Sequence, residues 1–404
     1  MRTSQKQSFT NKLSTCKQQK EIYLDNAATT KPCKEALFEA NKFAQIFWHN
    51  PSSLYNKSKD IKDYIEQARS KIGYYIGAKS NEVYFTSGGS ESNAWAIQGF
   101  IHNSILRGRK PIVITSIIEH KSILECICNL CVETHFIGVN SIGKVDLLQM
   151  KVLLERIKRD NPNSDILVSI QHANNEVGIM QPIKRIAEIV HSYGAVLHTD
   201  STQVVGHLPV DVKDIDVDLL SASAHKFYGL KGCGFLYIKN SIKIEPLIYG
   251  SQNNNMRGGT ENVIGIVAME KALSVCDVSP NMIDAKFDMR DKIMAILKKL
   301  PYNIEFNNYV GYKDTLPTII SMTIRENITA EALVYMLNTA NIYISAGAAC
   351  NAHSNVPSHV LRAIGLTEED SIRTVRISFD KHTTDKDIEI FVDELDKAIR
   401  VLKV

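Results

Sequence analysis

The sequence lacks an apolar run long enough to cross a membrane. A transmembrane helix needs about 20 consecutive apolar residues, whereas the longest apolar runs here have the length of a strand, such as Pro111–Thr115. An excess of charge of one sign is also absent, because the formal net charge is only +3 over 404 residues. We therefore expect neither a membrane partner nor direct binding to nucleic acid.

A disulfide framework is absent as well. The eight cysteines are irregularly spaced and no secretory apolar segment precedes them, so we expect a reducing compartment, the cytoplasm. Cys126, Cys128 and Cys131 are close enough in sequence to suggest a metal cluster. However, the apolar residues around them recur with helical periodicity, and on a helix Cys126 and Cys128 point to different sides. We favour a packed helix here and expect no resident metal ion.

The first twenty residues contain no acidic residue. They carry five basic residues, several serines and threonines, and few apolar positions. This composition favours an unstructured tail over residues 1–20. It also fits a transit peptide for a mitochondrion-related organelle, which is the alternative to a cytoplasmic location.

Strands and helices alternate between about Glu82 and Lys239. Short runs rich in apolar or β-branched residues predict strands at 83–86, 112–115, 133–139, 165–171, 195–200, 217–223 and 234–239. Helical periodicity lies between several of these runs, for example over Ile183–Tyr193, and also precedes the first, over Ile61–Ile76. This alternation predicts a mostly parallel sheet covered by helices on both faces.

The pattern changes after about Asp284. Helices are predicted at Ala285–Leu300 and Asp385–Leu402, with strands at SMTIR (321–325), YISAG (343–347) and VRISF (375–379) between them. We expect an α/β fold with a large domain over residues 21–283 and a smaller α+β domain over 284–404, to which the start of the chain contributes. The polar segment Tyr249–Thr260 predicts a long loop, and loops of that length are usually functional or disordered.

Polar residues follow the predicted strands of the large domain at their carboxyl ends. Asp200 ends the strand at 195–200, and Lys226 follows the strand at 217–223. A lysine that forms a Schiff base and an acid that keeps a pyridine nitrogen protonated are what pyridoxal 5′-phosphate requires of a protein. Because α/β sheets bind ligands at this edge, the two residues predict a site for that cofactor.

A glycine-rich turn at the same edge suits the phosphate of this cofactor. FTSGGSESN (85–93) joins a strand to a helix, so that backbone N–H groups, the helix dipole and the Ser90 hydroxyl are available to an anion. Such a turn is a weak signal alone. Together with Ser223 and His225, which flank the lysine region, it predicts a phosphate-binding cup.

Three further strand ends carry residues that suit the cofactor ring. His120 follows the strand at 112–115, where its side chain could stack on the ring. Gln203 lies three residues after Asp200 and could reach the phenolic oxygen. Asn175 follows the strand at 165–171. Together these residues are stronger evidence for a cofactor site than any one of them alone.

A series of short motifs runs from Tyr23 to about Leu402. They are YLDNAATT (23–30), NPSS (50–53), FTSGGSESN (85–93), EHKSIL (119–124), HANNEVG (172–178), HTDSTQVVG (198–206), SAHKFYGLKG (223–232), MRGGTENV (256–263), AGAAC (346–350) and VRISF (375–379). In this order they resemble the class V aminotransferase family, and within it the cysteine desulfurases of the NifS/IscS type. An ordered set of this kind is far more specific than a lone glycine motif.

The resemblance implies a pyridoxal-phosphate-dependent transferase of fold type I that acts as a homodimer. Lys226 would hold the cofactor covalently, Asp200 would contact the ring nitrogen, and His120 would cover the ring face. Gln203 and Asn175 would contact the ring oxygen and the substrate. The phosphate would be held by Gly89, Ser90, Ser223 and His225, and by Thr260 from the second subunit.

Cys350 lies among small and polar residues in Ser345–Pro357. A buried structural cysteine normally lies in an apolar run, so this composition predicts a mobile loop. The resemblance implies that Cys350 takes sulfur from L-cysteine as a persulfide, with Arg376 binding the substrate carboxylate. Because the thiolate is the reactive form, its proton must be removed, and His120 is a candidate for this role.

The implied reaction converts L-cysteine to L-alanine. The sulfur would pass to an acceptor protein, such as an iron–sulfur scaffold, for cluster assembly or thio-modification, and a transient contact of Cys350 with an iron–sulfur cluster is compatible with this role. A selenocysteine lyase or another class V enzyme is the alternative, although an aminotransferase has no need of Cys350. A non-catalytic sulfur carrier is less favoured, because Lys226 and Asp200 are intact.

The chain departs from the family pattern at a few positions. Asn253–Asn255 replace the usual acidic and glycine residues before Arg257, which puts the conformation of that loop in question. Ala346 and Ala348 stand where serines are common, and Tyr55 and Ser58 stand where histidine and glycine are frequent. No required chemical group is lost, so the expected activity is unchanged.

Overall fold

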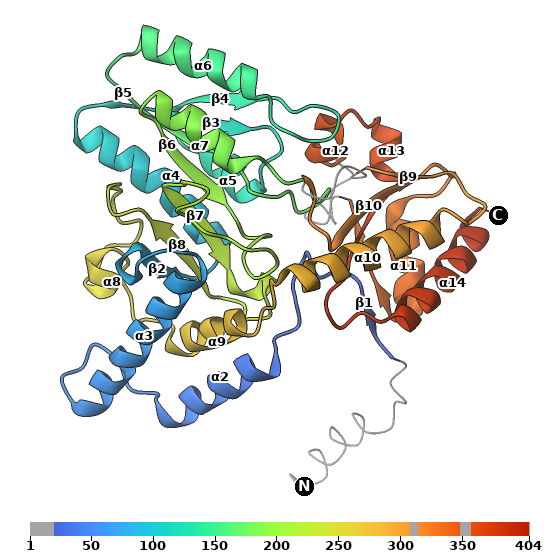
Figure 1. The fold of residues 1–404 in the computed structure, drawn as a ribbon, viewed down its shortest axis with the longest axis horizontal. Coiled ribbons are helices and arrows are strands. Elements are labelled where there is room, and N and C mark those ends of the chain that lie inside the picture. The colour runs from blue at the N-terminus through green and yellow to red at the C-terminus, as the bar shows by residue number, and fades with distance from the viewer. Residues whose placement is uncertain (1–19, 308–313, 348–356, 404) are drawn as a thin grey trace, which may run out of the picture.

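A seven-stranded sheet forms the centre of the larger part of the molecule (Figure 1). The computed structural model describes residues 20–307, 314–347 and 357–403. The strands are β2 (Val83–Thr86), β3 (Lys110–Ser116), β4 (Glu133–Ile137), β5 (Ser164–Ser169), β6 (Val196–Asp200), β7 (Leu219–Ser223) and β8 (Gly234–Ile238). Their order is β2-β8-β7-β6-β5-β3-β4. Only β8 runs against its neighbours, β2 and β7; the other pairs are parallel.

The predicted strands and the mostly parallel sheet are confirmed. β2 has the predicted bounds, and the other six strands overlap the predicted runs with ends displaced by one or two residues. β7 shows why these strands could be predicted from the sequence. Each of its residues is buried, because a strand covered on both faces must be apolar or small throughout.

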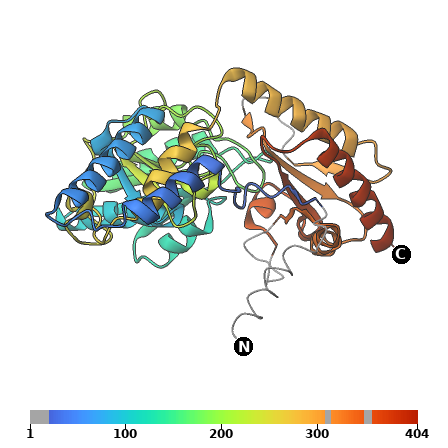
Figure 2. The same ribbon diagram turned by 90° about the horizontal axis from the view of Figure 1, so that it is seen from below.

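Helices cover both faces of this sheet (Figures 1 and 2). They are α2 (Lys34–Ile46), α3 (Asn56–Tyr75), α4 (Gly89–Leu106), α5 (Lys121–Cys128), α6 (Leu147–Asp160), α7 (Ile183–Ser192), α8 (Gln252–Asn255) and α9 (Val263–Ser274), with the short 3₁₀ helices η1 (Ser80–Glu82) and η2 (Ala224–Lys226). In α7 the buried side chains are Ile183, Ile186, Ala187 and Val190. This spacing forms one apolar face, which is why the sequence predicted the helix.

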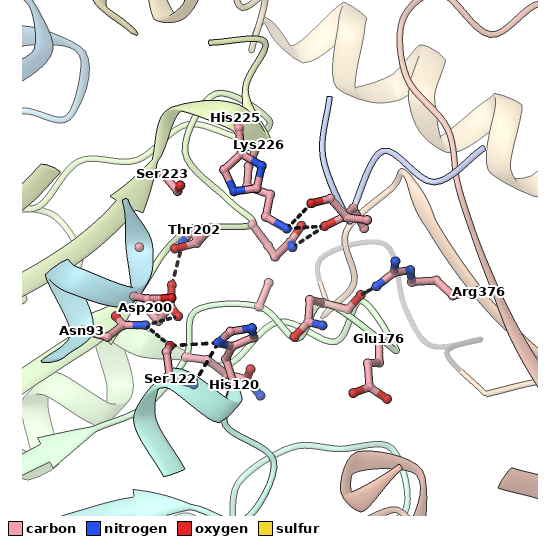
Figure 3. A pocket seen from close by; sticks show the side chains of 18 residues that line it. Asn93, His120, Ser122, Glu176, Asp200, Thr202, Ser223, His225, Lys226 and Arg376 are labelled. Atoms are coloured by element: carbon pink, nitrogen blue, oxygen red, sulfur yellow. Dashed lines mark hydrogen bonds between the residues drawn. The ribbon is translucent and has the colours of Figure 1, made fainter. Parts of the chain in front are cut away.

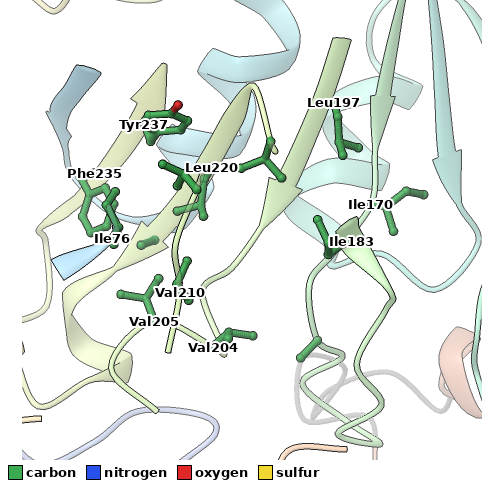
Figure 4. Close-up of a cluster of buried hydrophobic side chains, with 14 of the residues drawn as sticks. Ile76, Ile170, Ile183, Leu197, Val204, Val205, Val210, Leu220, Phe235 and Tyr237 are labelled. Atoms are coloured by element: carbon green, nitrogen blue, oxygen red, sulfur yellow. The ribbon is translucent and has the colours of Figure 1, made fainter. Parts of the chain in front are cut away.

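The two faces of the sheet belong to two separate apolar clusters. On β3, Ile112 and Ile114 pack into the first cluster, part of which is drawn in Figure 4. The intervening Val113 packs into the second, against Trp95 and Phe100 of α4. Alternate side chains of a strand point to opposite faces, so the sheet is a buried middle layer whose polar ends alone are available for chemistry.

A four-stranded antiparallel sheet forms the smaller part of the molecule (Figure 2). Its strands are β9 (Ile304–Phe306), β10 (Ile319–Ile324), β12 (Ser345–Ala346) and β13 (Thr374–Ser378), in the order β12-β13-β10-β9. The accompanying helices are α10 (Pro280–Leu297), α11 (Ala330–Thr339), α12 (His359–Ala363), α13 (Glu368–Ile372) and α14 (Asp385–Leu402). Near the start of the described chain, β1 (Ile22–Tyr23) pairs in parallel with β11 (Ile342–Tyr343).

One local prediction was wrong. The run YISAG does not form one strand, because Tyr343 pairs with β1 whereas Ser345 pairs with Arg376 on β13, in a different sheet. The packed helix predicted around the cysteines is confirmed, because Cys126 and Cys128 lie on α5 and Ile123 and Ile127 are buried, while Cys131 lies beyond its end. The described residues hold no cluster of three or more metal-binding side chains. Across the same ranges, every helix is too short or too polar to span a membrane.

The polar segment before Arg257 folds around three consecutive left-handed residues. Asn253, Asn254 and Asn255 have φ values of 47°, 58° and 63°, a conformation that asparagine tolerates better than most residues with a Cβ. The Asn253 side chain is buried and accepts a hydrogen bond from Nη2 of Arg69 at 3.0 Å. Arg69 is itself only 3% exposed. The three asparagines therefore form a tightly turned backbone and provide the hydrogen-bond partner of a buried arginine.

We predict that Asn253→Ala lowers the urea midpoint of unfolding more than Asn254→Ala does. Both substitutions place alanine at a positive φ, which costs about 1–2 kcal/mol. Only Asn253→Ala also removes an acceptor from the buried Arg69, at a further cost of about 1–3 kcal/mol. Circular dichroism during urea unfolding measures both midpoints, and equal shifts would contradict this role of Asn253.

Candidate active site

A pocket of about 310 Å³ opens at the carboxyl ends of the parallel strands (Figure 3). It is lined by the residues that the sequence predicted to bind cofactor and substrate: Gly89, Ser90, His120, Asn175, Asp200, Gln203, Ser223, His225, Lys226 and Arg376. Thr260 does not line the pocket and is exposed. Cys350 lies outside the described residues.

The parallel sheet explains why residues so far apart in sequence meet. Asp200 is the last residue of β6, Lys226 ends η2 directly after β7, and His120 caps α5 after β3. These strand ends lie along one edge of the sheet, where α/β folds bind ligands. Arg376 reaches the pocket from β13 of the smaller sheet, so the pocket lies where the two parts of the molecule meet.

One end of the pocket is shaped by glycines around the start of α4. Gly88 has a φ of 151°, and a Cβ built on Gly89 would lie 2.9 Å from Oγ1 of Thr202. A side chain at Gly89 would therefore fill the space between the helix N-terminus and Ser223. The N-terminus of an 18-residue helix attracts anions. Thr202 Oγ1 is buried with no hydrogen-bond partner among the described residues.

The side chain of His225 lies at the same end of the pocket and is neutral. Its Nδ1 lies 3.1 Å from the Thr29 hydroxyl. Burial, with a smaller contribution from the positive charge of Lys226, lowers the pKa of His225 to about 4. At neutral pH this imidazole can therefore offer a hydrogen bond without a net charge.

The Asp200 carboxylate is held by two donors. Its Oδ2 accepts from Nδ2 of Asn93 at 2.8 Å, and its Oδ1 accepts from the backbone N–H of Thr202 at 2.9 Å. Asp200 is only 7% exposed, so a further hydrogen-bond donor must reach its carboxylate from the pocket. The arrangement presents a fixed anion at the pocket wall, suited to a ligand that carries a protonated nitrogen.

The amine of Lys226 is fixed by the segment that follows β1. Its Nζ donates to the backbone carbonyls of Ala27 and Ala28 at 2.6 and 2.8 Å. Nε2 of Gln203 donates to the same Ala27 carbonyl at 3.0 Å. The carbonyl of Lys226 accepts in turn from Nε2 of His207 at 2.7 Å. The lysine is therefore oriented at both its backbone and its amine.

His120 lies beside Asn93 and Ser122 and lines the pocket (Figure 3). Its Nδ1 accepts from the backbone N–H of Ser122 at 3.1 Å and lies 2.8 Å from the Ser122 hydroxyl. Burial lowers the pKa of His120, and the positive charges of Lys226 and His359 act in the same direction, whereas Asp200 opposes them. At neutral pH the ring is therefore uncharged.

Arg376 carries a buried guanidinium at the other end of the pocket. It is 2% exposed, and Nη2 pairs with Oδ1 of Asp25 at 2.6 Å. Nη1 donates to the carbonyl of Asn175 at 2.8 Å, whereas Nε has no partner among the described residues. An anion in the pocket would satisfy that remaining donor.

Five polar residues that line the pocket were given no role from the sequence. They are Asn93, Ser122, Gln171, Glu176 and Thr202. Burial raises the pKa of Glu176 to about 7, and its Oε2 accepts a hydrogen bond from Ser358. Asn93, Ser122, Glu176 and Thr202 lie inside motifs that were already noted, and Gln171 ends the predicted strand at 165–171, so the motifs and the strand end were the signals that could have found them.

The chain is similar to characterised proteins over nearly its whole length. The family described as aminotransferase class-V matches residues 22–391. The cysteine desulfurase IscS of Dictyoglomus turgidum is 39% identical over 390 residues, which cover 95% of this chain and 96% of that protein.

Solved structures agree with the sequence comparison. A NifS-like protein superposes with a TM-score of 0.84 at 30% identity, covering 95% of this chain and 100% of the other. A structure described as SspA in complex with cysteine gives a TM-score of 0.76 at 32% identity, covering 90% and 100% of the two chains. The predicted fold type I is thereby confirmed. The chain belongs to the class-V aminotransferase family and, within it, to the cysteine desulfurases of the IscS/NifS type.

Proposed function

We propose that this protein is a pyridoxal-5′-phosphate-dependent cysteine desulfurase that converts L-cysteine to L-alanine and carries the released sulfur on Cys350. The observation that carries the proposal is the pocket in which Lys226 and Asp200 meet, within a chain that is 39% identical to a cysteine desulfurase. The structure of a relative described as bound to cysteine supports the choice of substrate.

The residues present fit the proposed cofactor. Thr202 Oγ1 and Asn93 Oδ1 are buried polar atoms without partners among the described residues, and such atoms need a ligand or water. The space that a Cβ on Gly89 would fill is open to a phosphate at the start of α4. We assign phosphate binding to Gly89, Ser90, Ser223 and His225, together with Thr260 from a second copy of the chain.

When bound, pyridoxal phosphate supplies an aldehyde that condenses with amines and a ring that accepts electrons. In the proposed site Lys226 Nζ would bind the aldehyde and would afterwards take the proton from Cα of the substrate. Asp200 would keep the ring nitrogen protonated through its buried carboxylate. His120 would cover the ring face, and Gln203 and Asn175 would orient the ring oxygen and the substrate.

Arg376 binds the α-carboxylate of the substrate in this proposal. Its guanidinium has an unpartnered Nε and is already fixed by Asp25, so little side-chain freedom is lost on binding. The planar fork matches a carboxylate. Burial of the arginine also strengthens its attraction for the anion.

The sulfur step requires a thiolate at Cys350. An S–S bond forms between Cys350 and the substrate sulfur as the Cβ–S bond breaks, and the electron pair of that bond stays with carbon, which takes up a proton. The sum is L-cysteine plus the Cys350 thiol giving L-alanine plus the Cys350 persulfide, with no external oxidant. The persulfide then passes to an acceptor protein, for which an iron–sulfur scaffold is our proposal, and the enzyme acts as a homodimer.

We predict that Lys226→Ala abolishes covalent attachment of the cofactor. Borohydride reduction of the wild-type protein loaded with pyridoxal phosphate should fix the cofactor to the peptide containing Lys226, as read by mass spectrometry. Lys231→Ala, which removes an exposed lysine nearby, should leave the attachment unchanged. Attachment at another lysine in the wild type would contradict the assignment.

We predict that Cys350→Ala eliminates sulfide release from L-cysteine in the presence of a thiol reductant, because no other residue is assigned to take the sulfur. The matched control is Cys128→Ala, which removes an exposed cysteine and should retain wild-type turnover. Sulfide and alanine are measured together over the same time course. Undiminished sulfide release by Cys350→Ala would overturn the persulfide mechanism.

We predict that Arg376→Lys raises KM for L-cysteine about ten- to a hundredfold, since charge-assisted hydrogen bonds contribute about 1.5–3 kcal/mol. Steady-state kinetics give KM, and the absorbance of the bound cofactor reports whether loading is preserved. An unchanged KM in a fully loaded variant would show that the substrate carboxylate binds elsewhere.

A further inference from the structure

A continuous chain of hydrogen bonds connects Asp200 to His120 (Figure 3). Nδ2 of Asn93 lies 2.8 Å from Oδ2 of Asp200 and 2.9 Å from Oγ of Ser122. Oγ of Ser122 lies 2.8 Å from Nδ1 of His120, and the backbone N–H of Ser122 reaches the same nitrogen at 3.1 Å. The residues come from α4, α5 and β6, so the chain spans three elements.

The direction of each bond follows from the chemistry of its partners. A carboxylate only accepts, so the amide nitrogen of Asn93 must face Asp200. The second hydrogen of that nitrogen is then directed to Ser122 Oγ, which accepts it. The Ser122 hydroxyl keeps its own hydrogen, and the partner in range for it is Nδ1 of His120.

Nδ1 of His120 therefore receives two donors. The hydroxyl is one, and the backbone N–H of Ser122, which the His120 side chain caps at the start of α5, is the other. A nitrogen that accepts twice cannot carry a hydrogen of its own in this geometry. In the neutral ring the proton must then lie on Nε2.

We propose that Asn93 and Ser122 are positioning residues that fix the proton of neutral His120 on Nε2, so that the ring offers an N–H to the pocket rather than a basic nitrogen. In the proposed desulfurase, on which this consequence rests, His120 then donates a hydrogen bond or proton to substrate atoms. It does not take the proton from the Cys350 thiol, contrary to the expectation from the sequence. The base at Cα is left to Lys226.

The charges around His120 do not reverse this assignment. Asp200 on β6 and Glu125 on α5 favour the charged ring, whereas Lys226 on η2 and His359 on α12 disfavour it. Burial is the largest influence and also lowers the pKa of His120. Protonation of Nδ1 would in addition break both bonds from Ser122, so the hydrogen-bond chain stabilises the neutral ring further.

Nitrogen NMR of the full-length, cofactor-loaded protein tests the tautomer without reference to activity. With ¹⁵N-labelled histidine, the His120 signals are identified as those lost in His120→Gln. We expect an unprotonated Nδ1 and a protonated Nε2 at neutral pH. A protonated Nδ1 in the wild type would overturn the inference. If the expected tautomer occurs in a protein without desulfurase activity, the proposed function fails while the tautomer assignment holds.

Ser122→Ala removes the hydroxyl donor and leaves the backbone donor. Loss of one such hydrogen bond should raise the pKa of His120 by about half to one unit, as read from the pH titration of its ¹⁵N signals. Ser122→Thr, which restores the hydroxyl, should return this pKa to its wild-type value. A pKa of His120 in Ser122→Ala equal to that of the wild type would contradict the positioning role.

The matched control is Ser169→Ala. The hydroxyl of Ser169 also lies against a histidine, 2.9 Å from Nδ1 of His198, and Ser169 is fully buried, but neither residue lines the pocket. The pKa of His120 in this variant should equal the wild-type value. A shift as large as that of Ser122→Ala would show that loss of any serine–histidine contact has the effect, and the specific role of Ser122 would be lost.

Discussion

The buried carboxylate of Asp200 is the interaction on which the rest of the site depends. A charge that is 7% exposed needs donors around it, and the chain supplies them from Asn93 on α4 and from the backbone of Thr202. These contacts fix α4 against β6, so the glycine-lined helix start is held at a defined distance from the acid. The same Asn93 amide also donates a hydrogen bond to Ser122, which in turn contacts His120. One anion thus aligns the phosphate end, the ring-nitrogen end and the ring-covering imidazole of the proposed cofactor site.

The second constraint is the segment after β1, which ties the two parts of the molecule together. Ile22 and Tyr23 pair with β11 beside the smaller sheet. Asp25 then holds Arg376, and the carbonyls of Ala27 and Ala28 hold the amine of Lys226 in the larger part. The proposed substrate anchor and the proposed cofactor lysine are therefore positioned by one short stretch of chain. A displacement of this stretch would disturb Arg376 and Lys226 at once, so the stretch couples the positions of the two side chains.

The sequence predicted what depends on local pattern and missed what depends on tertiary pairing. The positions of Asp200 and Lys226 at the sheet edge were predictable because Asp200 ends, and Lys226 follows, a strand buried on both faces, and such strands occur in the sequence as apolar runs. Arg376 was found only through family resemblance, because its strand belongs to another sheet. The split of YISAG between two sheets, and the route from Asp200 to His120 through Asn93 and Ser122, depend on partners distant in sequence. Thr260, predicted to act from a second subunit, does not line the pocket of the single chain.

The most direct test of the proposed reaction is a single turnover with L-cysteine that carries labelled sulfur. The full-length protein, loaded with pyridoxal phosphate and free of other thiols, is mixed with the labelled substrate and quenched. We expect equal amounts of L-alanine and of labelled sulfur, with the label on the peptide that contains Cys350. Labelled sulfide in solution without label on that peptide, or label transfer without alanine, would contradict the proposed reaction.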